Sequence, residues 1–189
     1  MSVEEIIQEY EKSLEIPNTK PEKQIMVCPV GVVASGKTTV MKPLSKKLSL
    51  LKISTDEIRK LLKENGYGYD SVKDLAYNLV NKYFGKGFSV AIDGDCHSEE
   101  AQEKIKKLKE KYKIKVFWIH INPPEEFIIN KLKNNKYTWL FRDAKQAIEN
   151  YKSSKERHKN LNFSFVYTFD TSRDDLDKQI EDCVTVIRN

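Results

Sequence analysis

Short apolar runs alternate along the chain with stretches in which apolar residues recur at helical spacing. The runs predict five strands, at residues 24–28, 50–54, 88–93, 114–121 and 163–169. The clearest helical stripe follows the second strand and consists of Val72, Leu75, Ala76, Leu79, Val80 and Tyr83. Alternating strands and helices are typical of βαβ units. We therefore predict an α/β fold in which helices cover both faces of a five-stranded parallel sheet.

A separate helix precedes the first strand. Ser2 and Glu5 have the spacing of a capping box, and apolar residues from Val3 to Leu14 share one helical face. We expect this N-terminal helix to span residues 1–15 and a linker to follow it. The length of 189 residues fits a single domain, 1–189, because domains commonly hold roughly 100–200 residues.

Composition and charge narrow the class of protein. No stretch approaches the roughly 20 apolar residues of a membrane-spanning helix, so we expect no membrane partner. The polar, acidic N-terminus lacks the regions of a secretory signal, and we expect a cytoplasmic protein. Three cysteines without a CxxC argue against a disulfide framework and a zinc site. The net charge of +5 permits an anionic substrate but is too small to indicate nucleic-acid binding by itself.

The residues from Gly31 to Thr38 match the phosphate-binding pattern GxxxxGK[ST], between a predicted strand and a predicted helix. Glycines there let the backbone curl until successive N–H groups converge on phosphate oxygens, and the helix presents its positive end to them. In this pattern Lys37 bridges the terminal phosphates and the hydroxyl of Thr38 ligates Mg²⁺. We expect nucleotide contacts from Gly31, Ala34, Ser35, Gly36, Lys37, Thr38 and Thr39.

The chain lacks the signatures of two other classes of P-loop protein. It has neither the NKxD nor the DxxG motif of GTPases, since the run that begins at Asp93 reads Asp-Gly-Asp-Cys. The LSGGQ signature of transporter ATPases is missing as well. Length and strand pattern fit the small kinases, in which one domain with a lid closes over two substrates and excludes water.

Asp56 and Arg59 form a second group of candidate site residues. Asp56 follows the second strand, at the sheet edge where open α/β folds bind ligands, and Arg59 lies one turn later on the same helical face. A carboxylate there can accept the proton of a hydroxyl acceptor, while an arginine binds an anionic group of that acceptor. The alternative is structural: Ser54, Thr55 and Asp56 all cap helices well, and Arg59 would lie in solvent.

A polar segment after the fourth strand interrupts the regular pattern. Three lysines within residues 131–136 precede Tyr137, Trp139 and Phe141. Exposed aromatic residues beside cations predict a mobile lid at about residues 131–145. A helix end packed by its own aromatic side chains fits the same pattern equally well.

Three segments together resemble the P-loop kinase group that contains polynucleotide 5′-hydroxyl kinases, zeta-toxin-like kinases and related small-molecule kinases. They are residues 30–39, 54–59 and 87–94, and the similarity extends over about residues 25–187. The resemblance implies a three-layer sandwich of the P-loop kinase type. The spacing between Asp56 and Arg59 is shared by kinases with very different acceptors, so it supports the reaction rather than a substrate.

The resemblance also implies roles for individual residues. Lys37 and Thr38 serve ATP and Mg²⁺, with GTP as an alternative to ATP. Asp56 is the general base and Arg59 binds the acceptor. Asp93 lies beside the metal and the acceptor, so Thr38 and Asp93 are the expected metal ligands.

The group usually has arginines after the fourth strand, and Arg142 is the only arginine of the predicted lid. Phosphoryl transfer normally uses a guanidinium to stabilise the developing charge. Arg142 is therefore the expected catalytic cation, with Lys131 and Lys133 as the alternative.

The histidines and the turn after the fifth strand have weaker assignments. His97 is a candidate contact of the acceptor or a polar surface residue, whereas His120 and His158 are expected to be structural. Residues 170–172, Asp-Thr-Ser, are expected to cap the last helix, and their backbone is a second candidate contact of the adenine.

These features predict an ATP-dependent kinase that phosphorylates a hydroxyl group, with the 5′ end of an RNA or DNA as the expected acceptor. One alternative is a kinase that acts on a small molecule such as a sugar, a nucleotide sugar or an antibiotic. The other is a regulatory module that binds a nucleotide and transfers no phosphate. The sequence specifies no oligomeric state.

Overall fold

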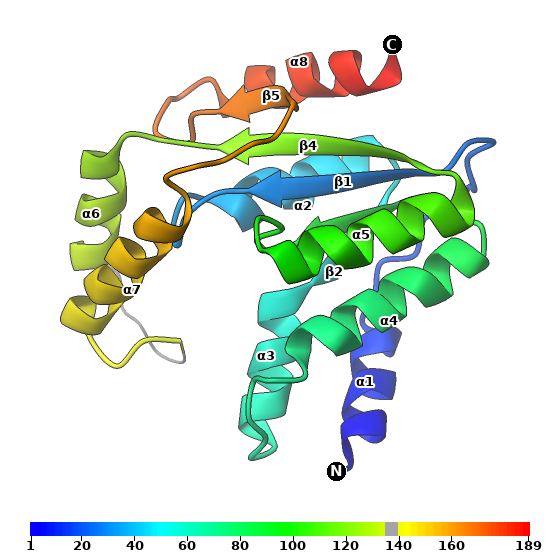
Figure 1. Ribbon diagram of the computed structural model, residues 1–189, viewed down its shortest axis with the longest axis horizontal. Coiled ribbons are helices and arrows are strands. Elements are labelled where there is room, and N and C mark those ends of the chain that lie inside the picture. The colour runs from blue at the N-terminus through cyan, green and yellow to red at the C-terminus, as the bar shows by residue number, and fades with distance from the viewer. Residues whose placement is uncertain (135–139) are drawn as a thin grey trace.

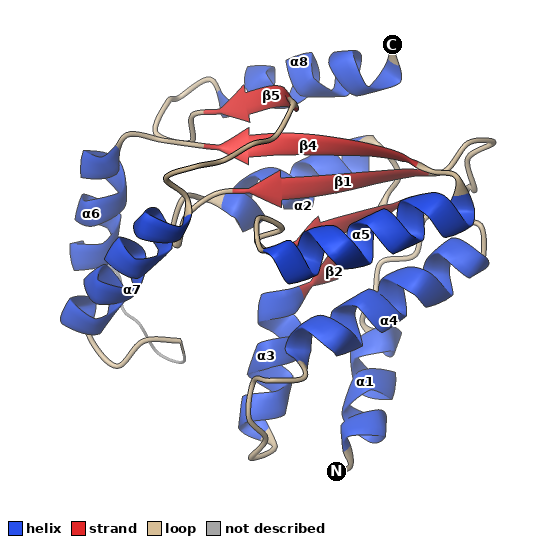
Figure 2. Ribbon diagram, in the orientation of Figure 1, coloured by secondary structure: helices blue, strands red, loops and turns tan. Residues whose placement is uncertain are grey.

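The computed structural model describes residues 1–134 and 140–189. Its strands form one five-stranded parallel sheet in the order β2, β3, β1, β4, β5 (Figures 1 and 2). They are β1 (Ile25–Val30), β2 (Leu51–Ser54), β3 (Val90–Asp93), β4 (Lys115–Ile121) and β5 (Phe165–Phe169). All five strands were predicted from the apolar runs, each to within two residues at either end.

Helices cover both faces of this sheet. The described helices are α1 (Val3–Lys12), α2 (Lys37–Lys47), α3 (Thr55–Glu64), α4 (Val72–Gly85), α5 (Glu99–Tyr112), α6 (Glu125–Asn134), α7 (Ala144–Arg157) and α8 (Leu176–Arg188). The first core contains apolar residues of α1, α3, α4 and α5, and the second contains those of α2 and α8. The predicted three-layer α/β sandwich is confirmed. Within the described residues, no helix has the length and apolar character needed to cross a membrane.

Helix α1 fixes the start of α3. The predicted capping box is present, because the backbone N–H of Glu5 donates to Ser2 Oγ (3.2 Å) and the Ser2 N–H donates to Glu5 Oε2 (2.8 Å). The buried hydroxyl of Tyr10 accepts a hydrogen bond from the N–H of Ser54 (2.7 Å). Because Ser54 is the N-cap of α3, this bond positions the helix that carries Asp56.

The carboxyl ends of the strands meet at one edge of the sheet. In the register, Ser54 of β2 lies beside Asp93 of β3, and Val30 of β1 lies beside His120 of β4. The strand arrowheads in Figure 1 point toward α6 and α7, which form a small third core with Val32 of the loop after β1. This edge therefore collects the loops that carry the predicted site residues.

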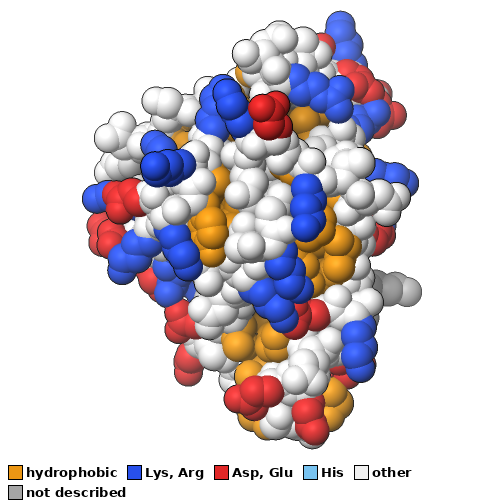
Figure 3. Space-filling model, turned by 90° about the vertical axis from the view of Figure 1, so that its right-hand side faces the viewer, with side chains coloured by type: hydrophobic (Ala, Val, Ile, Leu, Met, Phe, Trp, Pro, Cys, Tyr) orange, Lys and Arg blue, Asp and Glu red, His pale blue; other side chains and the backbone are white. Residues whose placement is uncertain are grey.

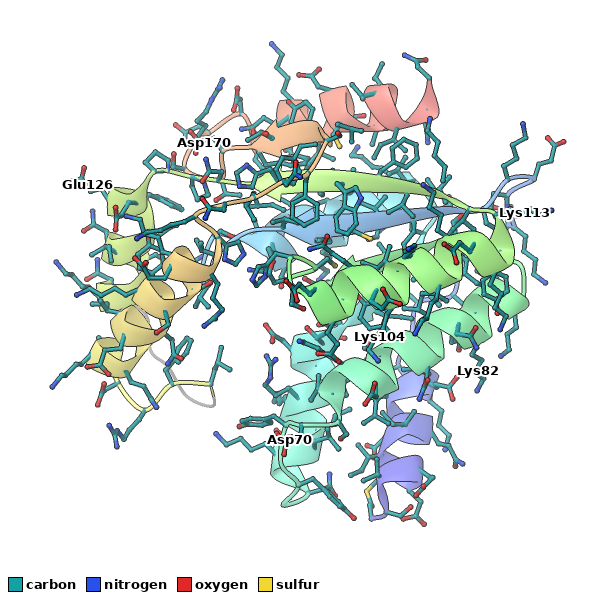
Figure 4. The ribbon with its side chains drawn as sticks, viewed as in Figure 1. Asp70, Lys82, Lys104, Lys113, Glu126 and Asp170 are labelled. Carbon is teal, nitrogen blue, oxygen red and sulfur yellow. The ribbon has the colours of Figure 1, made fainter. Side chains whose placement is uncertain are left out.

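The opposite end of the molecule carries charges of both signs. In Figure 4, Glu126 of α6 and Asp170 lie on the side of the strand carboxyl ends, whereas Lys113 lies on the opposite side. Figure 3 views that opposite side and shows several Lys and Arg side chains across the face, with Asp and Glu mostly toward its rim.

Candidate active site

The loop between β1 and α2 has the backbone of a phosphate-binding loop. Ala34 (φ 62°) and Gly36 (φ 96°) occupy the left-handed region, which favours glycine. A Cβ on Gly36 would lie 3.0 Å from the side chain of Thr171, and a Cβ on Gly31 would lie 2.6 Å from the carbonyl oxygen of Ile121. Both glycines are therefore required by the close approach of neighbouring segments.

Lys37 folds back over this loop. Its Nζ donates hydrogen bonds to the carbonyl oxygens of Gly31 (2.7 Å) and Val32 (2.8 Å). Burial lowers the pKa of Lys37, although the negative charges of Asp95 and then Asp56 oppose that shift. Helix α2 begins directly at Lys37, so its first N–H groups lack partners within the helix and lie next to the loop that the ammonium contacts. This arrangement suits a chain of phosphates.

Thr38 and Asp93 make a pair of oxygen ligands beside the loop. The hydroxyl of Thr38 donates to Asp93 Oδ1 (3.0 Å), and the side chain of Asp93 is only 2% exposed. Its second oxygen, Oδ2, is buried without a hydrogen-bond partner among the described residues. Burial raises the pKa of Asp93, and the nearby charge of Lys52 works against that rise. A buried carboxylate that lies beside a hydroxyl and is only partly compensated by Lys52 fits Mg²⁺, which prefers oxygen ligands.

Asp56 pairs with Arg59 on the first turn of α3, through Oδ1 and Nη1. Ser54 provides the cap of that helix, since its Oγ accepts a hydrogen bond from the N–H of Glu57 (3.3 Å). Of the three candidate caps, Ser54 is therefore the one that caps α3, and the role of Asp56 as general base stays a prediction. The side chain of Asp56 is 48% exposed and that of Arg59 is 30% exposed, so both groups are open to a ligand.

Two exposed tyrosines lie on the loop between α3 and α4, and one of them, Tyr69, contacts Arg59. The Arg59 guanidinium carbon is 5.8 Å from the ring centroid of Tyr69, within the range of a cation–π contact. Tyr67 and Tyr69 are 40% and 42% exposed. Arg59 thus joins the carboxylate of Asp56 to an exposed aromatic surface.

The predicted lid is described only at its two borders. Arg142 is 82% exposed and lies 3.5 Å from Asp143 Oδ2 through its Nε. Lys131 lies on the last turn of α6, and its Nζ donates to the carbonyl oxygen of Ala34 in the phosphate loop (3.5 Å). The structure thus brings Lys131 to the phosphate loop and leaves Arg142 toward solvent. The catalytic role of Arg142 stays a prediction.

The lid prediction also rested on aromatic residues. Tyr137 and Trp139 lie outside the described residues, and Phe141 packs at the edge of the small core between α6 and α7. The choice between a mobile lid and a packed helix end therefore stays a prediction.

Sequence reasoning missed two features near this site, the cation of Lys52 and a cluster of Asp95 with two histidines. Lys52 of β2 lies 3.5 Å from Asp93 Oδ2 through its Nζ, and its only signal was a charge within an apolar strand. Asp95 lies between two imidazoles, with its Oδ2 at 2.6 Å from His97 Nδ1 and at 3.1 Å from His158 Nε2. Burial alone would raise the pKa of Asp95, but its contacts with His158 and then His97 outweigh burial and lower that pKa. No spacing pattern connects a loop after β3 with the end of α7.

The turn after β5 contacts the phosphate loop and does not cap the last helix. The N-cap of α8 is Asp175, so the predicted capping role of residues 170–172 is wrong. Instead, Thr171 Oγ1 donates to the carbonyl oxygen of Ser35 (2.7 Å). Gln179 bonds the backbone N–H and carbonyl of Asp170 and holds the turn in place.

Comparison with known proteins places the chain in a family. The model of the AAA_33 family, described as an AAA domain, matches residues 26–154. The chain belongs to this family. The match includes Lys37, Asp56, Arg59, Asp93 and Arg142. No match was found among curated proteins.

Solved structures share the fold of this AAA_33 protein. A putative kinase from Chloroflexus aurantiacus has a TM-score of 0.68 and 14% identity, over 87% of this chain and 98% of that chain. A gluconokinase from Sinorhizobium meliloti has a TM-score of 0.58 and 13% identity, over 90% and 94%. The Mycobacterium tuberculosis APS kinase CysC, in complex with AMPPNP and APS, has a TM-score of 0.59 and 12% identity, over 89% and 100%. The fold is that of P-loop kinases.

Proposed function

We propose that this AAA_33 protein is a kinase that transfers the γ-phosphoryl group of ATP to a hydroxyl acceptor, with GTP as the alternative donor. One observation carries the proposal: Lys37, the Thr38 and Asp93 pair, and the Asp56 and Arg59 pair all lie at one edge of the sheet. A module that only bound nucleotide would need the first three residues and would have no use for an exposed carboxylate paired with an arginine.

Each residue has a distinct part in this reaction. Lys37 and the N–H groups at the start of α2 bind the phosphates. Thr38 and Asp93 would hold Mg²⁺, which when bound neutralises phosphate charge. Asp56 accepts the proton of the acceptor hydroxyl, and Arg59 binds an anionic group of the acceptor.

The acceptor we favour is the 5′-hydroxyl end of an RNA or DNA. The supporting observation is the exposed ring of Tyr69, which lies against the Arg59 guanidinium. Nucleic-acid bases stack on exposed aromatic rings, and stacking contributes roughly 1–3 kcal/mol per base. A phosphate of the same strand would lie within reach of the Arg59 guanidinium.

A small-molecule acceptor is the second candidate. The gluconokinase and the APS kinase that share this fold act on small anionic substrates, as their names state. Arg59 suits such an anion equally well. This candidate needs no contribution from Tyr69.

Labelled ATP, incubated with Mg²⁺ and a panel of acceptors, tests both candidates. The panel contains 5′-hydroxyl and 5′-phosphate oligonucleotides of RNA and DNA, gluconate and other sugars, and APS. We expect label on 5′-hydroxyl ends only, and labelling slower by roughly 100-fold or more with Asp56→Asn. Label on a sugar or on APS alone would establish the second candidate. No label in any lane, together with nucleotide binding, would favour the regulatory module.

A further inference from the structure

A carboxylate and two imidazoles meet beside the phosphate loop, at a place that the proposed reaction does not use. Asp95 and His97 lie on the loop after β3, and His158 lies at the end of α7. One ligand atom from each residue falls within 4.8 Å of the other two. We propose that Asp95, His97 and His158 bind a divalent transition-metal ion of the zinc class.

The orientation of His158 is the first argument. Its Nδ1 lies 2.6 Å from the carbonyl oxygen of Ser154, which can only accept a hydrogen bond, so Nδ1 carries a proton. Histidines that bind metals through one ring nitrogen commonly donate the other N–H to a carbonyl in this way. The second nitrogen, Nε2, is thereby turned toward Asp95.

The surroundings of Nε2 are the second argument. The side chain of His158 is 5% exposed, and Nε2 is buried without a hydrogen-bond partner of normal geometry among the described residues. Asp95 Oδ2 nevertheless lies 3.1 Å away. A nitrogen lone pair that faces a carboxylate oxygen repels it unless a proton or a metal ion lies between them. A metal ion bound to both Nε2 and Oδ2 would use both lone pairs, whereas the geometry between these two atoms is poor for a hydrogen bond.

The distances suit a zinc-sized ion after a small adjustment. Bonds of about 2.0–2.2 Å to nitrogen and oxygen place neighbouring ligand atoms of a tetrahedral site about 3.3 Å apart. Asp95 Oδ2 and His158 Nε2 are close to that separation at 3.1 Å. His97 Nδ1, at 2.6 Å from the same oxygen, has to withdraw by roughly 0.7 Å. The ring of His97 packs on that of His158 with a centroid distance of 4.0 Å, so binding requires this ring, which is 15% exposed, to move away from His158.

The bound ion would fasten α7 to the phosphate loop. Asp95 Oδ1 accepts a hydrogen bond from the N–H of Gly31 (3.4 Å), while Oδ2 faces the histidines. Ser154 of α7 accepts a hydrogen bond from the N–H of Val33 through its Oγ (3.2 Å). Asp95 is thus bonded to the phosphate loop, and α7, which carries Ser154, is bonded to the same loop. A metal ion between Asp95 and His158 would add a third connection between the loop and α7. Three protein ligands leave a coordination position open for water or another oxygen.

Zn²⁺ binding to the untagged, chelator-stripped full chain tests the proposal. We would titrate Zn²⁺ against a chromophoric chelator with millimolar Mg²⁺ present, so that Thr38 and Asp93 do not bind the added ion. We expect one Zn²⁺ per chain and a rise in melting temperature on binding. His158→Gln removes a ligand and should weaken Zn²⁺ binding by about 100-fold or more. Removal of a residue that only hydrogen-bonds to a metal ligand already lowers metal affinity by roughly 10–100-fold.

His120→Gln is the matched control, because His120 is the third histidine of the chain and lies on β4, stacked on Phe165. It should bind Zn²⁺ like the wild type. His97→Gln, at the more exposed position, serves as a second variant if His158→Gln melts too early to be measured. Equal Zn²⁺ binding by the wild type and both cluster variants would overturn the proposal. Binding of less than one Zn²⁺ per chain would overturn it as well, and would mean that a proton, rather than a metal ion, lies between His158 and Asp95. No readout uses phosphoryl transfer, so the result is independent of the proposed kinase activity.

Discussion

The hydroxyl of Thr38 and the carboxylate of Asp93 are joined by a hydrogen bond of 3.0 Å, although the two residues are 55 positions apart in the sequence. The bond connects the first turn of α2 to the end of β3 and directs one carboxylate oxygen toward the phosphate loop. The other oxygen is buried without a hydrogen-bond partner among the described residues. The only ion pair of this oxygen among the described residues is with Lys52 Nζ, at 3.5 Å, so its negative charge is only partly compensated until a further cation binds.

Asp93→Asn should stabilise the protein in the absence of nucleotide. Burial raises the pKa of Asp93 in the folded state, so the folded protein binds this proton more tightly than the unfolded chain does. The free energy of unfolding therefore falls as pH rises through that pKa. Asparagine carries no charge at any of these pH values, so the variant does not lose this stability. We expect a higher melting temperature than wild type at pH 7, by roughly 2–4 °C for each kcal/mol, and a smaller difference near pH 4.

The same variant should lose the response to Mg²⁺. Asparagine keeps an oxygen that accepts from Thr38, but it has no charge to offer a cation. Thermal melts with and without Mg²⁺ and ATP measure this. An Asp93→Asn protein that is less stable than wild type at pH 7 would show that Lys52 already compensates the buried charge.

Lys37→Ala should abolish the stabilisation of the protein by Mg²⁺ with ATP. Lys37 Nζ contacts two carbonyl oxygens of the loop and is partly buried, so its removal takes away the ammonium that binds the terminal phosphates. The variant should still fold, because glycine geometry and packing against Thr171 define the loop. Melting curves over a range of ATP concentrations measure the effect, with the exposed Lys42→Ala on the same helix as the control. Equal ATP-induced shifts in Lys37→Ala and wild type would contradict the assignment.

The sheet and the phosphate loop were predictable because their signals are local. Apolar runs marked each strand, and the pattern from Gly31 to Thr38 requires only adjacent residues to define the loop. Ser2 and Glu5 formed their capping box for the same reason.

The contacts that depend on tertiary packing could not be read from the sequence. His158 and Asp95 are 63 positions apart, and they meet only because α7 packs against the loop after β1. Cysteine spacing gave no indication of a metal site, because the candidate ligands are two imidazoles and a carboxylate. The turn at Asp170 has cap-forming residues, yet Gln179 bonds its backbone and the helix begins later, at Leu176.

Tyr10→Phe should destabilise the protein through the start of α3. The substitution keeps the buried ring but leaves the N–H of Ser54 without its acceptor. An unsatisfied buried donor costs about 1–3 kcal/mol, so the free energy of unfolding in urea should fall by that amount. Tyr67→Phe is the control, because the Tyr67 hydroxyl donates to the carbonyl oxygen of Met1 at an exposed site and should change stability by less than about 0.5 kcal/mol. Equal effects of the two substitutions would argue against this role of Tyr10.

Asp56→Asn and Arg59→Ala should affect different kinetic constants. Asparagine retains the shape of Asp56 but cannot accept a proton, so kcat should fall by roughly 10²-fold or more with nucleotide affinity unchanged. Arg59→Ala should mainly raise the KM for the acceptor. Glu64→Gln, at the exposed far end of α3, is the control for charge on that helix. Wild-type turnover by Asp56→Asn would remove the general base from the mechanism.

Lys131 and Arg142 should separate into a binding cation and a catalytic cation. Lys131 Nζ contacts the carbonyl oxygen of Ala34, and burial lowers its pKa, so it is positioned to meet phosphate when nucleotide binds. Lys131→Ala should therefore weaken ATP binding. Arg142 is exposed, and only its approach in the nucleotide complex would bring the guanidinium to the transferred group. Arg142→Ala should slow transfer by about 100-fold with little change in ATP affinity.

The Arg142→Lys variant tests whether transfer needs a guanidinium at residue 142 or only a positive charge. Arg142→Lys should recover only part of the lost rate, because an ammonium cannot form two parallel hydrogen bonds to phosphate oxygens. Lys145→Ala, at an exposed position of the first turn of α7, is the control for charge in this region. Single-turnover rates and ATP affinities of the four variants would be compared. If Arg142→Ala transfers phosphate at the wild-type rate while Lys131→Ala does not, the catalytic cation is Lys131, because its position beside the phosphate loop requires no movement of α7.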